Sequence, residues 1–587
     1  MSNEFTWRFT TLGVLLSALA GFIMIQMLRI QISPQADDLR LKGLAYSGNL
    51  TTIIPARGEI YDRGGNLLAG NTTVYEVGVE LADVENPGTI ALALNAVVGS
   101  NYDDIFTAAS VKPSQNAVYA SLARSVTTEQ KDRLEQLLGE MQKAYGDSKG
   151  QDRPSLAGLT FTPYLQRSYP EKSLGSNILG FVSREGRGYY GIEERYNDQL
   201  AGETRKVWIS LDPNQVEDRP NIPDGVSLIL TIDRDIQSEV EKILDQAINE
   251  SGSEAATIVV MAPKTGDILA MATTPRLDLN EYWRYDEVFM DSTPFNRAIS
   301  KTYEPGSVFK VLTMASALDS GTVKPDTTFL DTGSIEVGGN VIHNWDRGAW
   351  GPQTMLGCMQ HSLNVCLAWV ATELRANRFY RYLQAFGFGR LTGIDLAGEA
   401  AGRLKLPGDS DWYEADLGTN SFGQGVAVTP IQMAMAISAV ANDGKMIIPR
   451  IVLSFVDQNR QYNTSPQIAG EPISPETAHT LTEMLATSLE VESSVALVEG
   501  YRVAGKTGTA EIPTPTGYTS SQTHASFVGW GPVDDPQFLV YVWLEKPTTA
   551  PWGSVVAAPV FRQVVERLVV LMNIPSDKDR RRLMDSH

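Results

Sequence analysis

The segment from Phe9 to Leu28 constrains this chain more than any other stretch, because it runs for twenty residues without a charged side chain. Twenty apolar residues in an α-helix span the hydrocarbon core of a bilayer. Arg8 and Arg29 flank the run, and the residues that follow it (RIQISP) do not form a small-x-small cleavage site. We therefore expect an uncleaved, single-pass anchor in the cell membrane, with residues 1–8 in the cytoplasm and the bulk of the chain extracytoplasmic.

Length and composition exclude several classes of protein. At 587 residues the chain is too long for one hydrophobic core, so we expect more than one domain. The formal net charge of −20 argues against a nucleic-acid-binding protein, which would carry a basic face. With five histidines, two cysteines and no CxxC or HExxH pattern, we expect no metal site and no cofactor.

Breaker residues and changes of pattern divide the rest of the chain. A polar linker over residues 29–50 precedes short strand-like and helical stretches over residues 51–224, which predict a mixed α/β domain. The sequence PNIPDG, residues 220–225, is typical of a boundary. Residues 225–575 have strands early and late with helices between them, which predicts an α+β fold with an antiparallel sheet covered by helices. Residues 576–587 are charged, and we expect a frayed tail there.

A serine and a lysine three positions apart open a strongly apolar run, EPGSVFKVLTMASALDS. Residues at this spacing are neighbours on one face of an α-helix, so Ser307 and Lys310 can lie within reach of each other. The positions around Lys310 are apolar nearly all round, and burying an unpaired charge there would be expensive. The spacing by itself also arises by chance, so it indicates a nucleophile and its base only together with other motifs.

Two further motifs follow in the order known for serine acyl transfer. The sequence QHSLNVCLAWV contains S-x-N, and VAGKTGTAEI contains K-T-G. The ordered set SxxK, SxN and KTG is the signature of serine β-lactamases and penicillin-binding proteins. A second K-T-G, Lys264–Gly266, lies between two strand-like runs and is typical of a hairpin turn. The candidate residues of the later motifs are Ser362, Asn364, Lys506, Thr507, Gly508 and Thr509.

With these motifs, the chain after the anchor resembles the class B penicillin-binding proteins, which are bacterial peptidoglycan transpeptidases. Other stretches are similar to the family as well: RGEIYDRGGNLLA, GYYGIEERYNDQLAGE, NRAISKTYEPGSVFK, SFGQGVAVTP and THASFVGWGP. The resemblance implies an elongated pedestal (dimerisation-type) domain over residues 51–224. It implies a transpeptidase domain of the β-lactamase/transpeptidase-like fold over residues 225–575. The end of the chain is more similar to division-type than to elongation-type members.

The resemblance also implies how acylation proceeds. Ser307 would attack the carbonyl between two terminal D-alanines of a stem peptide. Lys310 would act as the base, and it must be neutral, so its pKa must fall far below 10.4. Burial and a neighbouring cation, for which Lys506 is the candidate, would lower it.

The remaining motif residues have roles implied by the same resemblance. Ser362 would relay a proton towards the leaving amine, and Asn364 would hold amide groups of the donor or substrate. The backbone N–H groups of Ser307 and Thr509 would form an oxyanion hole. Lys506, with the hydroxyls of Thr507 and Thr509, would bind the terminal carboxylate.

The resemblance implies the partners of the reaction too. The amine of a neighbouring strand would take the acyl group from the serine, giving the cross-link, whereas a β-lactam would acylate the same serine and stall. Implied partners are therefore peptidoglycan stem peptides, β-lactams, a membrane glycosyltransferase, and divisome or elongasome proteins.

Other enzyme classes fit less well. A Ser-His-Asp hydrolase would need a GxSxG elbow, but Pro305 and Phe309 occupy the glycine positions around the serine. We expect the three histidines considered for that role to be surface or core residues; they are His343, His361 and His524. A β-lactamase would not carry the anchor and pedestal. A membrane-anchored D,D-carboxypeptidase shares the whole catalytic set and stays open until the product is analysed.

Non-catalytic and bifunctional alternatives differ in their domain content. A β-lactam sensor would need more membrane spans and a cytoplasmic effector, for which residues 1–8 leave no room. A class A enzyme would need a glycosyltransferase domain, but RGEIYDRGG begins about thirty residues after Leu28. A scaffold function can coexist with catalysis.

The state of the two cysteines stays open from the sequence. Cys358 and Cys366 would lie about 12 Å apart along one continuous helix, too far for a disulfide. A helix break at Ser362 would bring them closer. We prefer free, buried cysteines as the expectation.

Overall fold

The computed structural model describes residues 3–32, 48–114, 117–146, 153–210, 222–290, 293–492, 494–514 and 517–584. They belong to two compact units, and each is described by itself. One contains Met1–Pro55 and Gly202–Asp224, and the other contains Ala56–Ala201 and Gly225–His587. Most of the expected linker and the first residues of the expected PNIPDG boundary lie outside the described residues.

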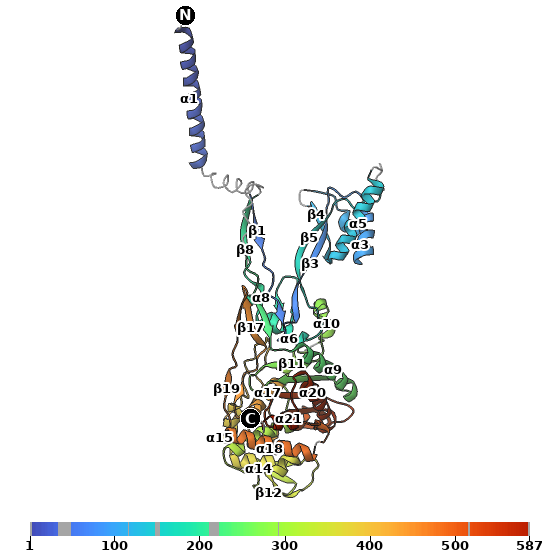
Figure 1. The fold of residues 1–587 in the computed structure, drawn as a ribbon, viewed down its shortest axis with the longest axis vertical. Coiled ribbons are helices and arrows are strands. Elements are labelled where there is room, and N and C mark those ends of the chain that lie inside the picture. The colour runs from blue at the N-terminus through green and yellow to red at the C-terminus, as the bar shows by residue number, and fades with distance from the viewer. Residues whose placement is uncertain are drawn as a thin grey trace. The chain divides into compact units, whose positions relative to one another are not determined.

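The first unit contains the apolar helix expected near the N-terminus. Helix α1 (Asn3–Ile32) is the dark blue helix of Figure 1. The most apolar 18-residue window of its Trp7–Ile32 segment has a mean hydropathy of 2.0 and is not buried against other parts of the protein. A helix of this length and composition can cross a bilayer. Strands β1 (Gly48–Ile53) and β8 (Arg205–Ser210) pair antiparallel in the same unit.

A long central strand organises the mixed α/β region of the second unit. Strand β3 (Leu67–Glu80) pairs antiparallel with β4 (Tyr119–Val126) and with β5 (Leu159–Ser168). Helix α5 (Thr128–Tyr145) begins with a capping box, in which Thr127 and Gln130 each bond the backbone N–H of the other. Three helices pack their apolar faces on this sheet: α3 Pro87–Val98, α4 Tyr102–Ala109 and α5 Thr128–Tyr145.

The same sheet continues into strands that come later in the sequence. Its order is β18-β17-β9-β2-β3-β4, with β5 also paired to β3. The added strands are β2 Ile60–Tyr61, β9 Ser227–Leu230, β17 Val452–Asp457 and β18 Arg460–Asn463. β2 and β9 run parallel, and the backbone N–H of Glu59 donates to Ser227 Oγ at 2.9 Å. Chain segments on both sides of residue 224 therefore share one sheet.

A buried charge cluster joins the two stretches that carry the pedestal resemblance. Arg57, from RGEIYDRGG, donates to Glu193 Oε2 at 2.7 Å, and Arg167 donates to Glu193 Oε1 at 2.7 Å. Glu193 is fully buried, and Tyr169 also donates to it at 3.3 Å. The short elements around the cluster are α6 Ser176–Leu179, β6 Phe181–Val182, β7 Gly188–Tyr189, α7 Gly191–Arg195 and α8 Asn197–Ala201. The carboxylate thus pairs with guanidinium groups from two separate segments.

We expect Glu193→Ala to lower the free energy of unfolding by about 3–5 kcal/mol, because it leaves two buried guanidinium groups without their carboxylate. A denaturant titration of the full chain, followed by fluorescence, measures the loss. The matched control is Glu287→Ala, which breaks the exposed Arg284–Glu287 ion pair and should change stability by less than about 1 kcal/mol. Equal effects of the two substitutions would contradict a structural role for the cluster.

A five-stranded antiparallel sheet forms the centre of the region after residue 225, in the order β11-β10-β22-β21-β20. The strands are β11 Ile268–Thr273, β10 Ala255–Met261, β22 Phe538–Glu545, β21 Gly517–Gly531 and β20 Ala504–Thr514. The two strand-like runs on either side of Lys264–Gly266 are β10 and β11, which pair as a hairpin, and this K-T-G lies in the turn between them. Every residue of β10, β11 and β22 is buried, so both faces of these strands are covered.

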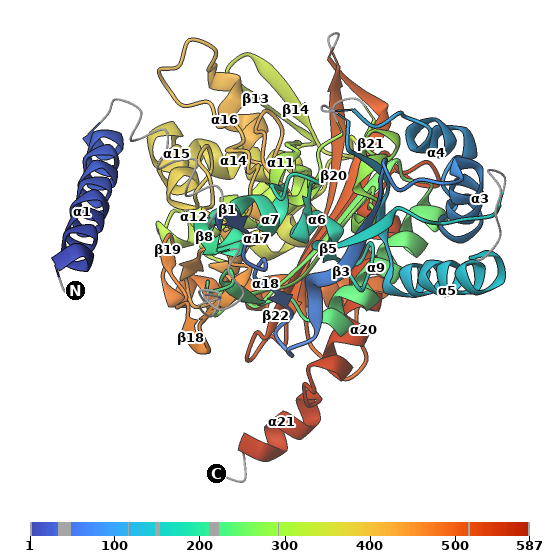
Figure 2. The same ribbon diagram turned by 90° about the horizontal axis from the view of Figure 1, so that it is seen from above.

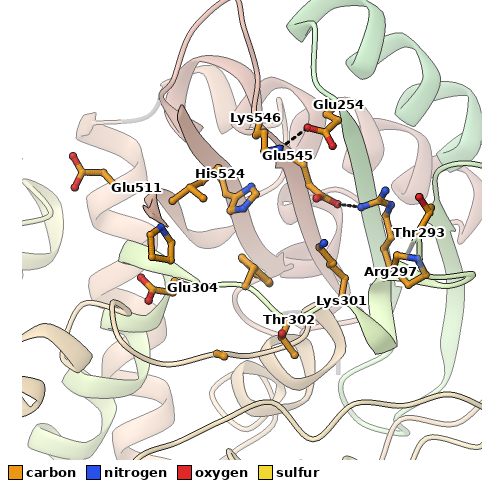
Figure 3. Close-up of a pocket in the computed structure, with 15 residues that line it drawn as sticks. Glu254, Thr293, Arg297, Lys301, Thr302, Glu304, Glu511, His524, Glu545 and Lys546 are labelled. Carbon is orange, nitrogen blue, oxygen red and sulfur yellow. Dashed lines mark hydrogen bonds and ion pairs between the residues drawn. The ribbon is translucent and has the colours of Figure 1, made fainter. Parts of the chain in front are cut away.

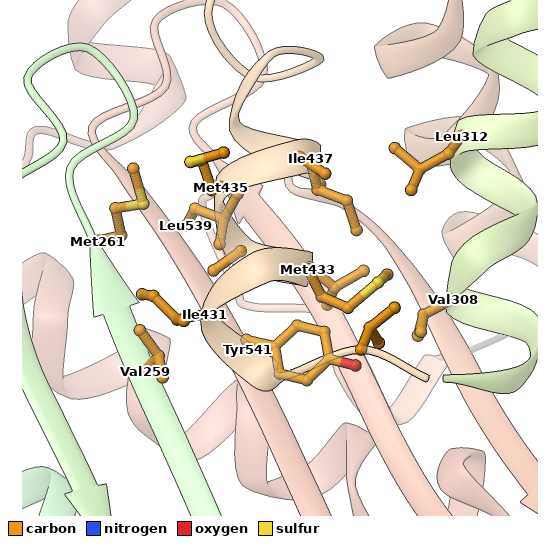
Figure 4. Packing of buried hydrophobic residues seen from close by; sticks show 14 of the residues in the cluster. Val259, Met261, Val308, Leu312, Ile431, Met433, Met435, Ile437, Leu539 and Tyr541 are labelled. Atoms are coloured by element: carbon orange, nitrogen blue, oxygen red, sulfur yellow. The ribbon is translucent and has the colours of Figure 1, made fainter. Parts of the chain in front are cut away.

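Helices cover the two faces of this sheet. On one face, α9 (Arg234–Ser251) and α20 (Ala558–Leu571) pack together against the strands, and Figure 2 shows them on the same side. On the other face lies α17 (Pro430–Ser438), whose Ile431, Met433 and Met435 point towards strand residues in Figure 4. The α+β fold with a helix-covered antiparallel sheet is therefore confirmed. This core holds the elements that carry the motifs.

The remaining elements surround this core. The helical ones are η1 Leu279–Arg284, α10 Tyr285–Val288, α11 Arg297–Ser300, η2 Gly306–Phe309, α12 Lys310–Asp319, α13 Met355–Gln360, α14 Asn364–Leu374, α15 Ala376–Ala385, α16 Glu414–Asn420, α18 Pro475–Glu492, η3 Ser494–Ala496, α19 Gly553–Val556 and α21 Asp577–Met584. The short strands are β12 Thr328–Asp331, β13 Ser334–Val337, β14 Asn340–His343, β15 Gly351–Thr354, β16 Met446–Ile447 and β19 Ile468–Gly470.

The expectation of a frayed charged tail is wrong for residues 577–584, which form α21. Arg580 is 9% exposed and pairs with Asp534 and Asp577, while Asp577 also accepts from the backbone N–H of Arg502 at 2.8 Å. Two of the charges that suggested a solvated end, Asp577 and Arg580, are instead partners for groups outside the helix. A run of charges in sequence does not reveal whether its partners lie nearby in space.

Candidate active site

The first motif lies on a tight turn that leads into α12. Ser307 lies in the 3₁₀ turn η2 and is half-buried, and the α-helix itself begins at Lys310, which is completely buried. The turn approaches β20 closely because Gly306 has a positive φ of 61° and no side chain. A Cβ there would lie 2.8 Å from the Thr509 carbonyl oxygen. The serine is thus accessible while the lysine three positions later is not.

The Lys310 amine joins the first two motifs. Its Nζ lies within hydrogen-bond distance of the Ser362 carbonyl (2.7 Å), Ser362 Oγ (3.2 Å) and Asn364 Oδ1 (2.7 Å). Among the hydrogen bonds of the described residues, none joins this amine to Ser307. Burial first, and then the charge of Lys506, hold the pKa of Lys310 well below its usual value. These are the two causes that the sequence suggested for a neutral lysine.

The second motif occupies a break between two helices. Ser362 adopts a left-handed backbone conformation with φ of 53° between α13 and α14. Asn364 begins α14, and its Nδ2 donates to the His343 carbonyl at 3.1 Å while its Oδ1 accepts from Lys310. The resemblance implies that Asn364 binds amide groups of a ligand. In this structure both polar atoms of its side chain bond other residues of the protein.

The third motif lies on the edge strand β20 of the central sheet. Lys506 is 5% exposed, and its Nζ donates to the Thr507 carbonyl at 3.3 Å. The hydroxyl of Thr509 accepts a hydrogen bond from the Gly553 N–H at 3.0 Å, so its own proton remains to be donated. A Cβ at Gly508 would lie 2.3 Å from Ser526 Oγ and 2.9 Å from Val308 Cγ1. Only glycine lets β20 lie directly against the turn that carries Ser307.

The preference for free cysteines is wrong, because Cys358 and Cys366 form a disulfide with a Cα–Cα distance of 6.1 Å. The helix break at Ser362 provides the physical reason. Since α13 ends at Gln360 and α14 begins at Asn364, the two cysteines do not share one helix axis. The sequence raised this possibility but could not decide it.

The histidines do not form a catalytic triad with the motif serines. His361 stacks on Trp350 with ring centroids 4.3 Å apart, and His343 lies exposed on β14. His524 is mostly buried, and burial together with Lys546 and Lys301 lowers its pKa to about 4. None of the hydrogen bonds in the part of the chain that the structure describes links a histidine side chain to Ser307.

Two tryptophans that the sequence did not indicate lie beside the second and third motifs. Trp345 donates from Nε1 to the His361 carbonyl at 3.2 Å, next to Ser362. Trp552 directly precedes Gly553, which bonds Thr509. The two rings meet edge to face with centroids 5.7 Å apart, although each side chain is substantially exposed. Their separation in sequence leaves no spacing signal that could have predicted the contact.

A hollow of about 490 Å³ lies beyond the motifs, at one end of the central sheet (Figure 3). The residues that line the hollow include the buried Arg297–Glu545 ion pair and the Lys546–Glu254 ion pair, both at 2.7 Å. None of the eight motif residues lines it. Within the described ranges, no group of three or more His, Cys, Asp or Glu side chains could hold a metal ion.

Comparison with known proteins agrees with the fold. The penicillin-binding protein transpeptidase domain matches residues 256–566, and the penicillin-binding protein dimerisation domain matches residues 52–221. The chain therefore belongs to the penicillin-binding protein transpeptidases, and the dimerisation domain before the transpeptidase domain places it in class B.

Several curated relatives extend over most of the chain. Stage V sporulation protein D of Bacillus subtilis is 33% identical over 526 residues, which cover 87% of this chain and 77% of that protein. Penicillin-binding protein PbpB of Mycolicibacterium smegmatis is 30% identical and covers 98% and 92%. Peptidoglycan D,D-transpeptidase FtsI of Escherichia coli is 27% identical and covers 98% and 94%.

A solved structure has a similar fold. Penicillin binding protein 3 from Mycobacterium tuberculosis, complexed with aztreonam, aligns with a TM-score of 0.68 at 25% identity. The alignment covers 90% of this chain and 98% of that one.

Lys506 offers a test of the electrostatics of this site. We expect Lys506→Gln to slow acylation by a β-lactam about 10- to 100-fold, because a charge-assisted hydrogen bond to the ligand carboxylate is lost. If Lys310 must be neutral to accept a proton, the rate rises with pH through the pKa of Lys310. Removing the neighbouring cation raises that pKa, so the rising limb should move to higher pH. The measurement is the acylation rate against pH, and Lys506→Arg, which keeps the charge, should leave the limb in place.

Proposed function

We propose that this protein is a serine-type peptidoglycan D,D-transpeptidase that cross-links stem peptides through an acyl-enzyme on Ser307. One observation carries the proposal. Lys310 is completely buried with a depressed pKa, lies three residues from the half-exposed Ser307, and bonds the side chains of Ser362 and Asn364. A buried amine with a lowered pKa, three residues along the chain from an accessible hydroxyl, suits the base of an activated serine.

Acylation begins when Ser307 Oγ attacks the carbonyl carbon of the penultimate D-alanine and its proton passes to neutral Lys310. The C–N bond to the terminal D-alanine then breaks, and the leaving amine takes a proton through Ser362, whose hydroxyl lies 3.2 Å from Lys310 Nζ. The backbone N–H groups of Ser307 and Thr509 stabilise the oxyanion between these steps, and losing one such donor costs about 10²- to 10³-fold.

Deacylation completes the cross-link. The amine of a neighbouring stem peptide attacks the ester carbonyl, an amide bond forms, and the C–O bond to Ser307 breaks while the serine regains its proton. Substrate orientation comes from Lys506 and from the hydroxyls of Thr507 and Thr509, which meet the terminal carboxylate. The Thr509 hydroxyl is suited to this role because it accepts from Gly553 and has its proton free to donate.

β-Lactams are the covalent inhibitors that this site predicts. Opening of the lactam ring leaves the cleaved amine attached to the acyl group, so no leaving amine departs and Ser307 stays acylated. The structural similarity to a penicillin binding protein complexed with aztreonam supports this expectation.

The cellular role we propose is in cell division. The similarity of the end of the chain to division-type members supports it. The length and composition of α1 support anchoring in the cell membrane, and we place the catalytic region outside the cytoplasm, where its peptidoglycan substrate lies. We assign residues 51–224 to the pedestal and residues 225–575 to the transpeptidase domain. A membrane glycosyltransferase and divisome proteins are the partners that this role requires.

Product analysis tests the proposed activity. The full chain in lipid vesicles receives lipid-linked, uncross-linked peptidoglycan, and the digested products are separated by mass. We expect dimeric, cross-linked peptides that disappear in Ser307→Ala. Release of D-alanine without dimers would show a D,D-carboxypeptidase instead.

A further inference from the structure

A disulfide brackets the second catalytic motif. The Cys358–Cys366 bond encloses seven residues that include Ser362 and Asn364, and it connects the last turn of α13 with the first turn of α14. Both cysteines are completely buried in the main hydrophobic core, so the disulfide lies in the interior of the protein. The disulfide therefore restrains the turn between the two helices.

That turn has an unusual backbone conformation, and other elements contact it: Trp345 Nε1 donates to the His361 carbonyl and Asn364 Nδ2 donates to the His343 carbonyl. Ser362 holds a left-handed conformation that non-glycine residues adopt rarely. The turn is closed by a hydrogen bond from Leu363 N to the Cys358 carbonyl at 3.0 Å and a longer one from Ser362 N to the Met359 carbonyl at 3.3 Å. In this conformation the Ser362 carbonyl points at Lys310 instead of continuing a helix.

All three hydrogen bonds that Lys310 Nζ makes end on residues inside the disulfide-closed loop. Lys310 forms no ion pair with a carboxylate among the residues that the structure describes, and the charged group acting on it is Lys506 of β20. The position of the loop therefore decides what the amine contacts. It also decides whether water reaches the amine, since the loop forms part of its enclosure.

We propose that the Cys358–Cys366 disulfide is a positioning element for acylation, which holds Ser362 and Asn364 against the Lys310 amine. The inference rests on the proposed function, because it assigns the bond to the proton-transfer step of that reaction. The oxidising environment outside the cytoplasm, where such bonds persist, is consistent with it. A bond that only stabilised the fold would leave the environment of Lys310 unchanged once the protein is folded.

The test compares full-length wild type with Cys358→Ala/Cys366→Ala in the rate constant for acylation by fluorescent penicillin between pH 5.5 and 9.5. We expect the rate at neutral pH to fall about 10²-fold, since misplacement of a catalytic group by about 1 Å has that effect. We also expect the rising limb of the pH profile to move to higher pH, because a loosened loop admits water to Lys310 and relieves the burial that lowers its pKa.

A matched control separates positioning from stability. Val370→Ala removes a buried side chain from α14, four residues beyond Cys366 and outside the loop. It should lower the thermal unfolding midpoint and leave the pH limb in place. If the double variant changes the rate and the limb no more than Val370→Ala does, the disulfide is structural only and the inference is wrong.

Reduced wild type provides a second measurement in case the double variant does not fold. Dithiothreitol gives two electrons and two protons to the bond, yielding two thiols and the cyclic oxidised reagent, and the thiols are counted by mass after alkylation. We expect slower acylation that reoxidation restores. An unchanged rate in fully reduced protein would overturn the inference while leaving the proposed function intact. Failure of oxidised wild type to acylate would overturn both.

Discussion

Fluorescent penicillin is expected to label the wild-type protein covalently and to leave Ser307→Ala unlabelled. Ser307 is the only accessible hydroxyl that we assign to attack, and no ester can form without its Oγ. The label should survive denaturation and gel electrophoresis, because it is a covalent bond. The expected loss is complete rather than partial.

Ser362→Ala is the matched control for this experiment. It removes the second serine of the site, whose hydroxyl lies 3.2 Å from Lys310 Nζ, but it leaves the attacking oxygen. We expect slow but measurable labelling, since general acid–base help is worth about 10²- to 10⁴-fold rather than everything. Strong labelling of Ser307→Ala, or complete loss only in Ser362→Ala, would assign the nucleophile to a different residue.

The parts of the fold that the sequence predicts best are those with strong local patterns. The two strand-like runs around Lys264–Gly266 form the β10–β11 hairpin, and the uncharged run from Phe9 to Leu28 lies in α1. Contacts between residues far apart in the sequence have no comparable local pattern. The parallel contact between β2 and β9 joins residues 60–61 to 228–229, and the Arg57–Glu193 ion pair joins two motifs that had been recognised only by resemblance.

In the candidate site, too, some features could be predicted from the sequence and others depend on the tertiary fold. The order of the three motifs indicated the candidate side chains, because serine acyl transfer requires a nucleophile, a base and a carboxylate-binding strand. The disulfide could not be decided, since it depends on the left-handed conformation of Ser362 and no residue type at that position indicates it. The contact between Trp345 and Trp552 depends on the tertiary fold alone.

Replacing Lys310 with alanine is expected to slow penicillin acylation by about 10²- to 10⁴-fold, the range for loss of a general base. The serine remains, so labelling should reach completion at long times. Because Lys310 needs to be neutral, the wild-type rate should rise with pH and level off well below the ordinary lysine pKa, and this limb should vanish in Lys310→Ala. Acylation reactions stopped at set times over a range of pH values give both the rate constant and its pH dependence.

Lys310→Arg distinguishes a base from a fixed positive charge. Arginine keeps a cation and hydrogen-bond donors near Ser362 and Asn364, but it does not lose its proton at accessible pH. If the amine acts by accepting the serine proton, Lys310→Arg should be as slow as Lys310→Ala. A rate near that of the wild type would mean that a charge at this place is enough, and the proton transfer from Ser307 would then need another acceptor. Matching thermal unfolding midpoints show that the variants compared are folded, which matters because Lys310 is completely buried between α12 and the Ser362 turn.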